Sequence, residues 1–186
     1  MAAFPYYAYY GTKIIYTVPQ LHDEMEIYIS MNHNGNFLVQ DTRYPLETGS
    51  LVLIHPFEIH YVFSSIKDHT ERYDLRFPIK ILERLSTLQS NLLNVFKTAP
   101  RHIVLSRPDL MKLCGMMEEL IAPVGSAFGE DIQKTILLEN FLLTLASILR
   151  HHHEEKSALQ DLPDHTVIDT ITYISAHYLE SIHLDD

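Results

Sequence analysis

Residues 24–30, Glu-Met-Glu-Ile-Tyr-Ile-Ser, alternate between two kinds of side chain. Successive side chains of a strand point to opposite sides of a sheet, so a period of two predicts a β-strand. Its two faces would be Met25, Ile27 and Ile29 on one side and Glu24, Glu26 and Tyr28 on the other. Asn34-Gly35 follows, and this dipeptide is typical of the tight turn that joins two antiparallel strands.

The rest of the first 78 residues has the same texture of short apolar runs between turn residues. The further strands predicted are Lys13–Val18, Phe37–Gln40, Leu51–Ile54, Ile59–Phe63 and Glu71–Phe77. In the last of them, Tyr73, Leu75 and Phe77 alternate with Arg72, Asp74 and Arg76. Many short strands at close spacing predict a β-sandwich or a small barrel.

After Pro78 the apolar residues recur every three or four positions, which predicts helices. They are expected over residues 79–89, from an N-cap at Ser106 to Ile121, and over Glu130–His152. The last carries a wide apolar stripe of Ile132, Ile136, Leu137, Phe141, Leu142, Leu145, Ile148 and Leu149. This stripe predicts a partner helix, either in a second subunit or in the same chain, and periodicity does not choose between the two.

The chain has 186 residues and a formal net charge of −10. Its length fits one domain and part of another. The excess of acidic residues argues against a surface that binds nucleic-acid phosphates by charge. Cys114 is the single cysteine, so no intrachain disulfide can form. No signal peptide and no membrane-spanning apolar run is evident, which predicts a soluble cytoplasmic protein.

The densest group of residues with chemical potential lies between residues 20 and 60. His22 and Glu26 are four positions apart at the start of a predicted strand, and His55 and His60 flank a proline turn. In a small barrel, inward-facing residues of neighbouring strands converge on one interior. Two histidines and a carboxylate there could hold a metal ion or form hydrogen bonds to a polar organic ligand.

The segment Gly49-Ser-Leu-Val-Leu-Ile-His-Pro-Phe-Glu-Ile-His60 resembles the second conserved motif of the cupins. Gln20-Leu-His22 followed by Glu26 and Gly35 resembles the first, which is His-x-His-x3-Glu. The first histidine of that motif is Gln20 here, which weakens a reading as a metal enzyme but leaves His22, Glu26 and His60 as three potential ligands.

A narrower resemblance joins the two ends of the chain. The strings His22–Ile29, Tyr44–Gly49 and Leu53–Pro56 with His60 are similar to the N-terminal regulatory domain of AraC-family transcription regulators. Residues 167–186, Val-Ile-Asp-Thr-Ile-Thr-Tyr-Ile-Ser-Ala-His-Tyr-Leu-Glu-Ser-Ile-His-Leu-Asp-Asp, are similar to the first helix of that family's DNA-binding domain.

The resemblance implies an α+β fold that is divided along the chain. Residues 1–78 would form a cupin-like effector-binding β-barrel (a double-stranded β-helix), completed by a strand near 101–105. Residues 79–155 would be a helical dimerisation element, and 156–163 a linker. Residues 164–186 would begin a helix-turn-helix domain that is otherwise missing from this chain. The family implies a homodimer that binds DNA only through that missing domain.

The barrel is expected to bind a small effector, such as a sugar, without catalysis and without a cofactor. The candidate effector-binding residues are His22, Glu26, Tyr28, His55, His60, Tyr7 and Tyr9. The candidate dimerisation residues are Ile132, Ile136, Leu137, Phe141, Leu145, Ile148 and Leu149.

Other interpretations remain open. His22, Glu26 and His60 could be structural polar groups, or the ligands of a metal-dependent cupin enzyme. The barrel could be empty and the chain a purely structural dimerisation module. The tyrosines of the first ten residues could cover a ligand, or they could form an ordinary first strand.

Overall fold

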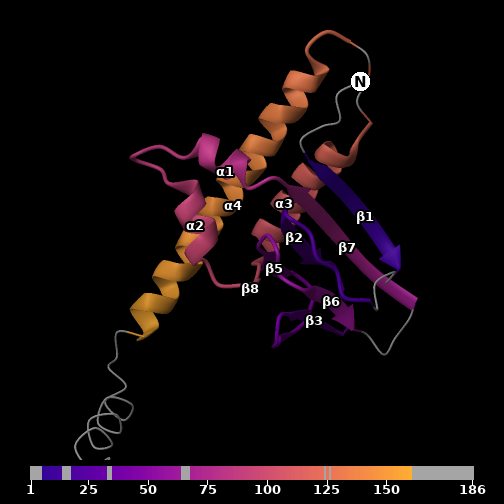
Figure 1. Cartoon of the computed structure of the whole chain (residues 1–186), viewed down its shortest axis with the longest axis vertical. Helices are drawn as coiled ribbons and strands as arrows, with labels where there is room; N and C mark the ends of the chain where they lie inside the picture. The colour runs from indigo at the N-terminus through magenta and orange to yellow at the C-terminus, as the bar shows by residue number, and fades with distance from the viewer. Residues whose placement is uncertain are drawn as a thin grey trace, which may run out of the picture. The chain divides into compact units, whose positions relative to one another are not determined.

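The computed structural model describes residues 6–13, 18–32, 35–63, 68–123, 125 and 127–160 (Figure 1). The strands are β1 Tyr7–Lys13, β2 Met25–Ser30, β3 Asn36–Val39, β4 Thr42–Pro45, β5 Ser50–Ile54, β6 His60–Phe63, β7 Asp68–Phe77 and β8 His102–Val104. The helices are α1 Lys80–Leu85, α2 Leu92–Thr98, α3 Arg107–Ile121 and α4 Glu130–Gln160. The described residues up to His151 form one compact unit, and those from His152 onward belong to a second.

The strands form two antiparallel sheets, which confirms the predicted α+β class and the small cupin-like barrel. The larger sheet has the order β1-β7-β2-β5-β8, and the smaller has the order β4-β3-β6. A bridge between Gln20 and His60 ties the segment before β2 to β6. The inner faces share one apolar cluster, in which Tyr28, Val52 and Ile54 of the larger sheet lie with Phe37, Val39 and Val62 of the smaller.

The alternation predicted for β2 and β7 decides what each face of the larger sheet contacts. The apolar residues of these two strands, including Ile27, Leu75 and Phe77, belong to a core that the sheet shares with the helices. Its polar residues, including Glu26 and Asp74, point into the barrel and are buried as well. The polar face of these strands is therefore an interior surface.

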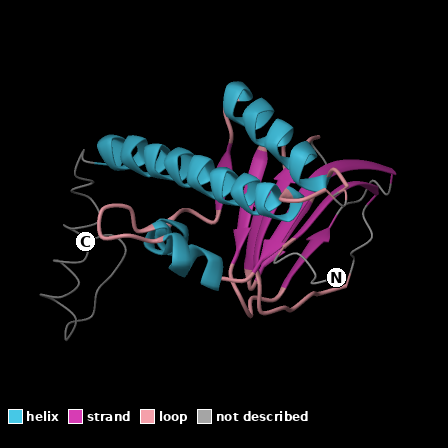
Figure 2. Cartoon of the chain, turned by 90° about the horizontal axis from the view of Figure 1, so that it is seen from above, coloured by secondary structure: helices cyan, strands magenta, loops and turns pink. Residues whose placement is uncertain are grey.

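Helices cover the outer face of the larger sheet, as Figure 2 shows. Of the residues predicted for dimerisation, Phe141, Leu145 and Leu149 are fully buried in the shared core, and Leu137 and Ile148 pack against it. Ile132 and Ile136 are exposed. Much of the stripe thus packs within the chain, which was the second possibility that its periodicity allowed. This packing also accounts for the apolar character of Glu130–His152, which by length and composition alone could cross a membrane.

Several element boundaries differ from those predicted. The first strand is Tyr7–Lys13, so the tyrosine-rich stretch is confirmed as a strand, while its contact with an effector stays a prediction. Most of the strand predicted over Lys13–Val18 lies outside the described residues. The helix expected over 79–89 ends at Leu85, because the backbone turns extended at Ser86, with φ −76° and ψ 135°. The Ser86 hydroxyl donates to the Leu82 carbonyl and accepts from the Leu93 amide. A separate helix, α2, then starts at an Asn91 cap.

Near the C-terminus, α4 continues to Gln160, so residues 156–160 of the predicted linker are helical. The remainder of that linker, and the predicted first helix of a DNA-binding domain, lie outside the described residues. Between these regions, Ser106 caps α3 as predicted, since its hydroxyl accepts from the Asp109 amide. Strand β8 lies within 101–105 and pairs with β5.

Lys134 of α4 joins that helix to the end of α3. Its ammonium group is buried and donates to the carbonyl oxygens of Glu119, Leu120 (3.2 Å) and Ala122 (2.7 Å). The last carbonyls of a helix have no partner within the helix and carry partial negative charge, so a cation stabilises them. Burial lowers the pKa of Lys134.

Replacing Lys134 with methionine is expected to lower the free energy of unfolding by about 2 kcal/mol, because three carbonyls lose a charged donor. Urea denaturation at neutral pH would measure the loss. Lys112→Met, at an exposed position of α3, is the matched control and should change stability by less than about 0.5 kcal/mol. Equal effects of the two substitutions would show that Lys134 does not cap the helix.

Candidate functional site

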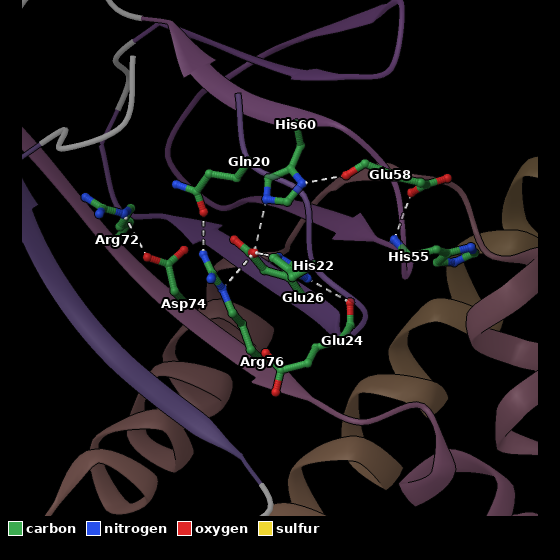
Figure 3. A network of polar contacts seen from close by, with 10 residues as sticks. All are labelled: Gln20, His22, Glu24, Glu26, His55, Glu58, His60, Arg72, Asp74 and Arg76. Carbon is green, nitrogen blue, oxygen red and sulfur yellow. Dashed lines mark hydrogen bonds and ion pairs between the residues drawn. The ribbon is translucent and has the colours of Figure 1, made fainter. Parts of the chain in front are cut away.

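Glu26 lies at the centre of a buried polar cluster inside the barrel (Figure 3). Its Oε2 atom is 2.7 Å from His22 Nε2, 3.3 Å from His60 Nε2 and 2.9 Å from Arg76 Nε. Strand pairing explains the last contact, because Glu26 of β2 stands directly opposite Arg76 of β7. The bridge between Gln20 and His60 brings β6 and the segment before β2 together at the same place.

Backbone carbonyls fix the orientation of both histidine rings. His22 Nδ1 is 3.1 Å from the Glu24 oxygen, and His60 Nδ1 is 2.9 Å from the Glu58 oxygen. A carbonyl only accepts hydrogen bonds, so each ring donates from Nδ1. The Nε2 atoms therefore face Glu26, and they are the atoms through which each imidazole can take a proton, bind a metal or meet a ligand.

Further charges surround this centre. Arg76 donates to the Gln20 side-chain oxygen at 2.8 Å, and Arg72 donates to Asp74 at 2.9 Å. Burial raises the pKa of Glu26, but the contacts with His22 and His60 and the charge of Arg76 outweigh it and lower that pKa to about 2. Burial and the nearby charge of Glu26 raise the pKa of Asp74 to about 6. The pKa values of the two carboxyl groups in this interior are thus shifted in opposite directions.

The interior has little free volume. A cavity of about 10 Å³ remains, lined by Gln20, Glu26, Tyr28, Phe37, His60, Tyr61, Val62, Arg72 and Asp74. The Phe37 ring stacks on His60 with centroids 6.1 Å apart and meets Tyr28 edge-on at 4.8 Å. This space suits about one water molecule, so a metabolite must displace side chains in order to enter.

The structure brings together His22, Glu26 and His60, as the sequence predicts, and Tyr28 lines the same interior. Tyr9 also faces this side, with the Arg72 guanidinium 5.8 Å from its ring centre. Tyr7 stacks against Tyr9 but is 53% exposed.

His55 does not join the cluster. Its Nε2 atom is 3.1 Å from the Phe96 carbonyl of α2, and its amide donates to Glu58 Oε2. The turn between β5 and β6 separates it from His60, and Phe57 in this turn has a φ of 64°. This positive φ is unusual for a residue other than glycine, and nothing in the motif spacing indicates it.

Sequence reasoning did not identify Arg72, Asp74 and Arg76 as site residues. Their alternation with Tyr73, Leu75 and Phe77 was visible in the sequence, and they could have been found by assigning that polar face to the barrel interior. In the motif Gln20 is only a departure from metal binding, whereas in the structure its side-chain oxygen accepts a hydrogen bond from Arg76.

The ligand set of a cupin metal can be tested against this geometry. One donor atom from each of His22, Glu26 and His60 lies within 4.8 Å of the others, and two imidazoles with one carboxylate suit a first-row transition metal. However, Arg76 places a permanent positive charge 2.9 Å from the shared carboxylate oxygen. The donors fit a metal, and this charge opposes one.

Comparisons with known proteins cover most of the chain. A family model described as "AraC-like ligand binding domain" matches residues 7–142. No curated protein matches the chain. Among solved structures, apo ToxT carrying one substitution, from Vibrio cholerae strain SCE256, is similar with 12% identity and a TM-score of 0.52. That match covers 80% of this chain and 58% of ToxT.

Two further structures are similar at lower TM-scores. Another crystal form of Vibrio cholerae ToxT has 10% identity and a TM-score of 0.48, and the match covers 80% of this chain and 58% of that chain. A cupin 2 conserved barrel domain protein from Salinispora arenicola has 20% identity and a TM-score of 0.36, with 43% of this chain and 69% of that chain covered. At these identities the similarity to ToxT concerns the fold.

Proposed function

Because the chain belongs to the AraC-like ligand-binding domain family, we propose that it is the sensing region of a transcription regulator and binds its effector around Glu26. The observation that carries this proposal is the burial of Glu26, Arg72, Asp74 and His60 in one barrel interior. Burying charges is costly, and a ligand that hydrogen-bonds to them would offset part of that cost.

The composition of the cluster favours a neutral, hydroxyl-rich effector such as a sugar. Carboxylates of Glu26 and Asp74 accept hydrogen bonds, and guanidinium groups of Arg72 and Arg76 donate them. A hydroxyl group can do both, so it can insert between an acid and a base without leaving either charge unpaired. The Phe37 and Tyr28 rings add apolar surface of the kind that packs on a sugar ring.

A route for the signal leads from the cluster to the helices. The Glu58 carbonyl holds His60, while the Glu58 side chain binds the His55 amide at 2.8 Å and Arg101 at 2.6 Å. His55 in turn contacts the Phe96 carbonyl of α2. An effector that moves His60 would therefore strain the loop between β5 and β6. The effector can shift the equilibrium between two conformations of this loop only by the difference in its affinity for them.

The output of this region would be the pairing of two subunits in the cytoplasm and the placement of DNA-binding domains that follow residue 164. Ile132, Ile136 and Leu143 are exposed on α4 and are spaced to share one side of the helix, which supports a homodimer contact there.

The competing function is a metal-dependent cupin enzyme that uses His22, Glu26 and His60. The positive charge of Arg76 and the family membership support a non-catalytic role instead. Elemental analysis of the purified chain separates the two. Stoichiometric iron, manganese, zinc or nickel that is lost on His60→Ala would support the enzyme.

Effector binding can be tested by a thermal-shift screen of pentoses, hexoses, sugar acids and small carboxylates, followed by calorimetry on each hit. A true effector at 100 times its Kd should add about 2.7 kcal/mol of stability. Arg76→Gln should weaken binding roughly tenfold or more, because it removes a charged donor from the cluster.

Arg43→Gln is the matched control, since Arg43 is an exposed arginine that bonds to Asn36 on the smaller sheet. Equal affinities of the Arg76→Gln and Arg43→Gln variants would place the effector elsewhere. A screen in which no compound binds would favour the purely structural module.

A further inference from the structure

A second hollow lies on the opposite face of the larger sheet, where the end of α3 meets β1 and β7. Its volume is about 430 Å³, within the usual range for a small-molecule site. It is lined by Tyr10, Tyr73, Glu118, Ile121, Ala122 and Pro123. We call it the tyrosine pocket. Strand alternation separates it from the barrel, since Tyr10 and Tyr73 point away from the side on which Tyr9, Arg72 and Asp74 lie.

The lining combines aromatic rings with a carboxylate. The rings of Tyr10 and Tyr73 are 4.9 Å apart and tilted by 47°, so they form two adjoining walls. Tyr73 is only 5% exposed, and its hydroxyl donates to Glu118 Oε1 at 3.1 Å. None of the six lining residues carries a positive charge. The pocket therefore combines one carboxylate with two tyrosine side chains and has no opposing cation in its lining.

The wall formed by Ala122 and Pro123 is held in place from two sides. Lys134 of α4 donates to the Ala122 carbonyl, and the Tyr6 hydroxyl donates to the Leu120 carbonyl at 3.3 Å. These contacts anchor the end of α3 to α4 and to the residue that precedes β1. The pocket shape thus depends on groups that the barrel cluster does not use.

We propose that the tyrosine pocket binds a small organic cation, such as an amine or a quaternary ammonium group. The faces of tyrosine rings attract a cation through their quadrupole, and the Glu118 carboxylate supplies the opposite charge. An anion would be repelled by the Glu118 carboxylate and would find no positive charge among the lining residues, and a neutral apolar molecule would gain nothing from that carboxylate. This site is separate from the effector site proposed in the barrel.

Calorimetry on the 186-residue chain with choline as the probe tests this assignment. Its neutral isostere 3,3-dimethyl-1-butanol has the same shape without the charge. Choline should bind measurably and the isostere at least tenfold more weakly. Tyr10→Ala and Glu118→Gln should each weaken choline binding roughly fivefold, in line with one cation–π or ion-pair contact.

Three controls keep the result specific. Glu119→Gln makes the same charge change one residue further along α3, outside the pocket lining, and should leave choline affinity unchanged. Lys112→Met, at an exposed position of α3 outside the pocket lining, should change affinity less than twofold. His60→Ala should also leave it unchanged, which separates this site from the barrel. Equal binding of choline and the isostere, or equal effects of Glu118→Gln and Glu119→Gln, would overturn the proposal.

Discussion

Replacing Glu26 with glutamine is expected to lower the free energy of unfolding by about 3 kcal/mol. The substitution keeps the size of the side chain but removes the negative charge that faces Arg76 and two histidines. Removing one partner of a buried ion pair costs about 3–5 kcal/mol, and the lower end applies because the Arg76 side chain is 22% exposed. Urea unfolding at pH 7 would measure the change.

A double-mutant cycle with Arg76→Gln checks the cause of that loss. If the contact between Glu26 and Arg76 matters, the double variant should be more stable than the sum of the two single losses predicts. Strict additivity, or a loss below about 0.5 kcal/mol for Glu26→Gln, would contradict a central role for this carboxylate.

The same carboxylate predicts a pH dependence with a definite sign. The pKa of Glu26 in the folded protein is about 2, below its ordinary value of 4.5. A lowered acid pKa adds stability that is complete above the unfolded value and is lost as pH falls through the folded value. Wild type should therefore lose this contribution between about pH 4.5 and 2, and Glu26→Gln should not.

Asp74 contributes a change of the opposite sign in a higher window. Its pKa is raised from 3.8 to about 6, so its contribution is largest below pH 3.8 and declines as pH rises through about 6. The contribution of Glu26 to the free energy of unfolding is therefore measured below pH 3.8, where that of Asp74 no longer changes. A wild-type stability that stays flat from pH 4 to 2, relative to the Glu26→Gln variant, would be incompatible with the lowered pKa.

Replacing Phe141 with alanine should be the most destabilising change on the helical side of the molecule. Phe141 is fully buried in the core shared by α4 and the larger sheet. Truncation of a buried phenylalanine costs about 3–5 kcal/mol, because apolar burial is lost and a cavity remains. Thermal or urea unfolding at low protein concentration would measure this loss in the protomer itself.

Ile136→Asp, on the same helix, should leave the stability of the protomer almost unchanged and weaken the association of two subunits instead. Ile136 is 51% exposed, so a charge there should change the stability of the protomer by less than about 0.5 kcal/mol. If this side of α4 pairs two subunits, sedimentation should show weaker association for Ile136→Asp. A Phe141→Ala variant that unfolds like wild type and only dissociates would show that the stripe is an interface and not a core.

The sequence alone determined the division into strands and helices and the alternation of β2 and β7, whereas the convergence of His22, Glu26 and His60 follows only once the strands close into a barrel. These features follow from local spacing, because a period of two or of 3.6 fixes which side chains share a face. The resemblance of residues 20–60 to the cupin motifs supplied the closure of the strands into a barrel, which spacing could not.

Only the tertiary structure decided which residue stands opposite Glu26, where His55 points and what covers α4. The pairing of Glu26 with Arg76 depends on the register of strands far apart in the chain, and no local pattern records that register. His55 contacts the Phe96 carbonyl of α2, and no local pattern records this contact between residues 41 positions apart. An apolar stripe predicts that a helix face is buried. It does not predict which surface covers that face, because the hydrophobic effect has no direction. The packing of α4 on its own sheet was therefore visible only in three dimensions.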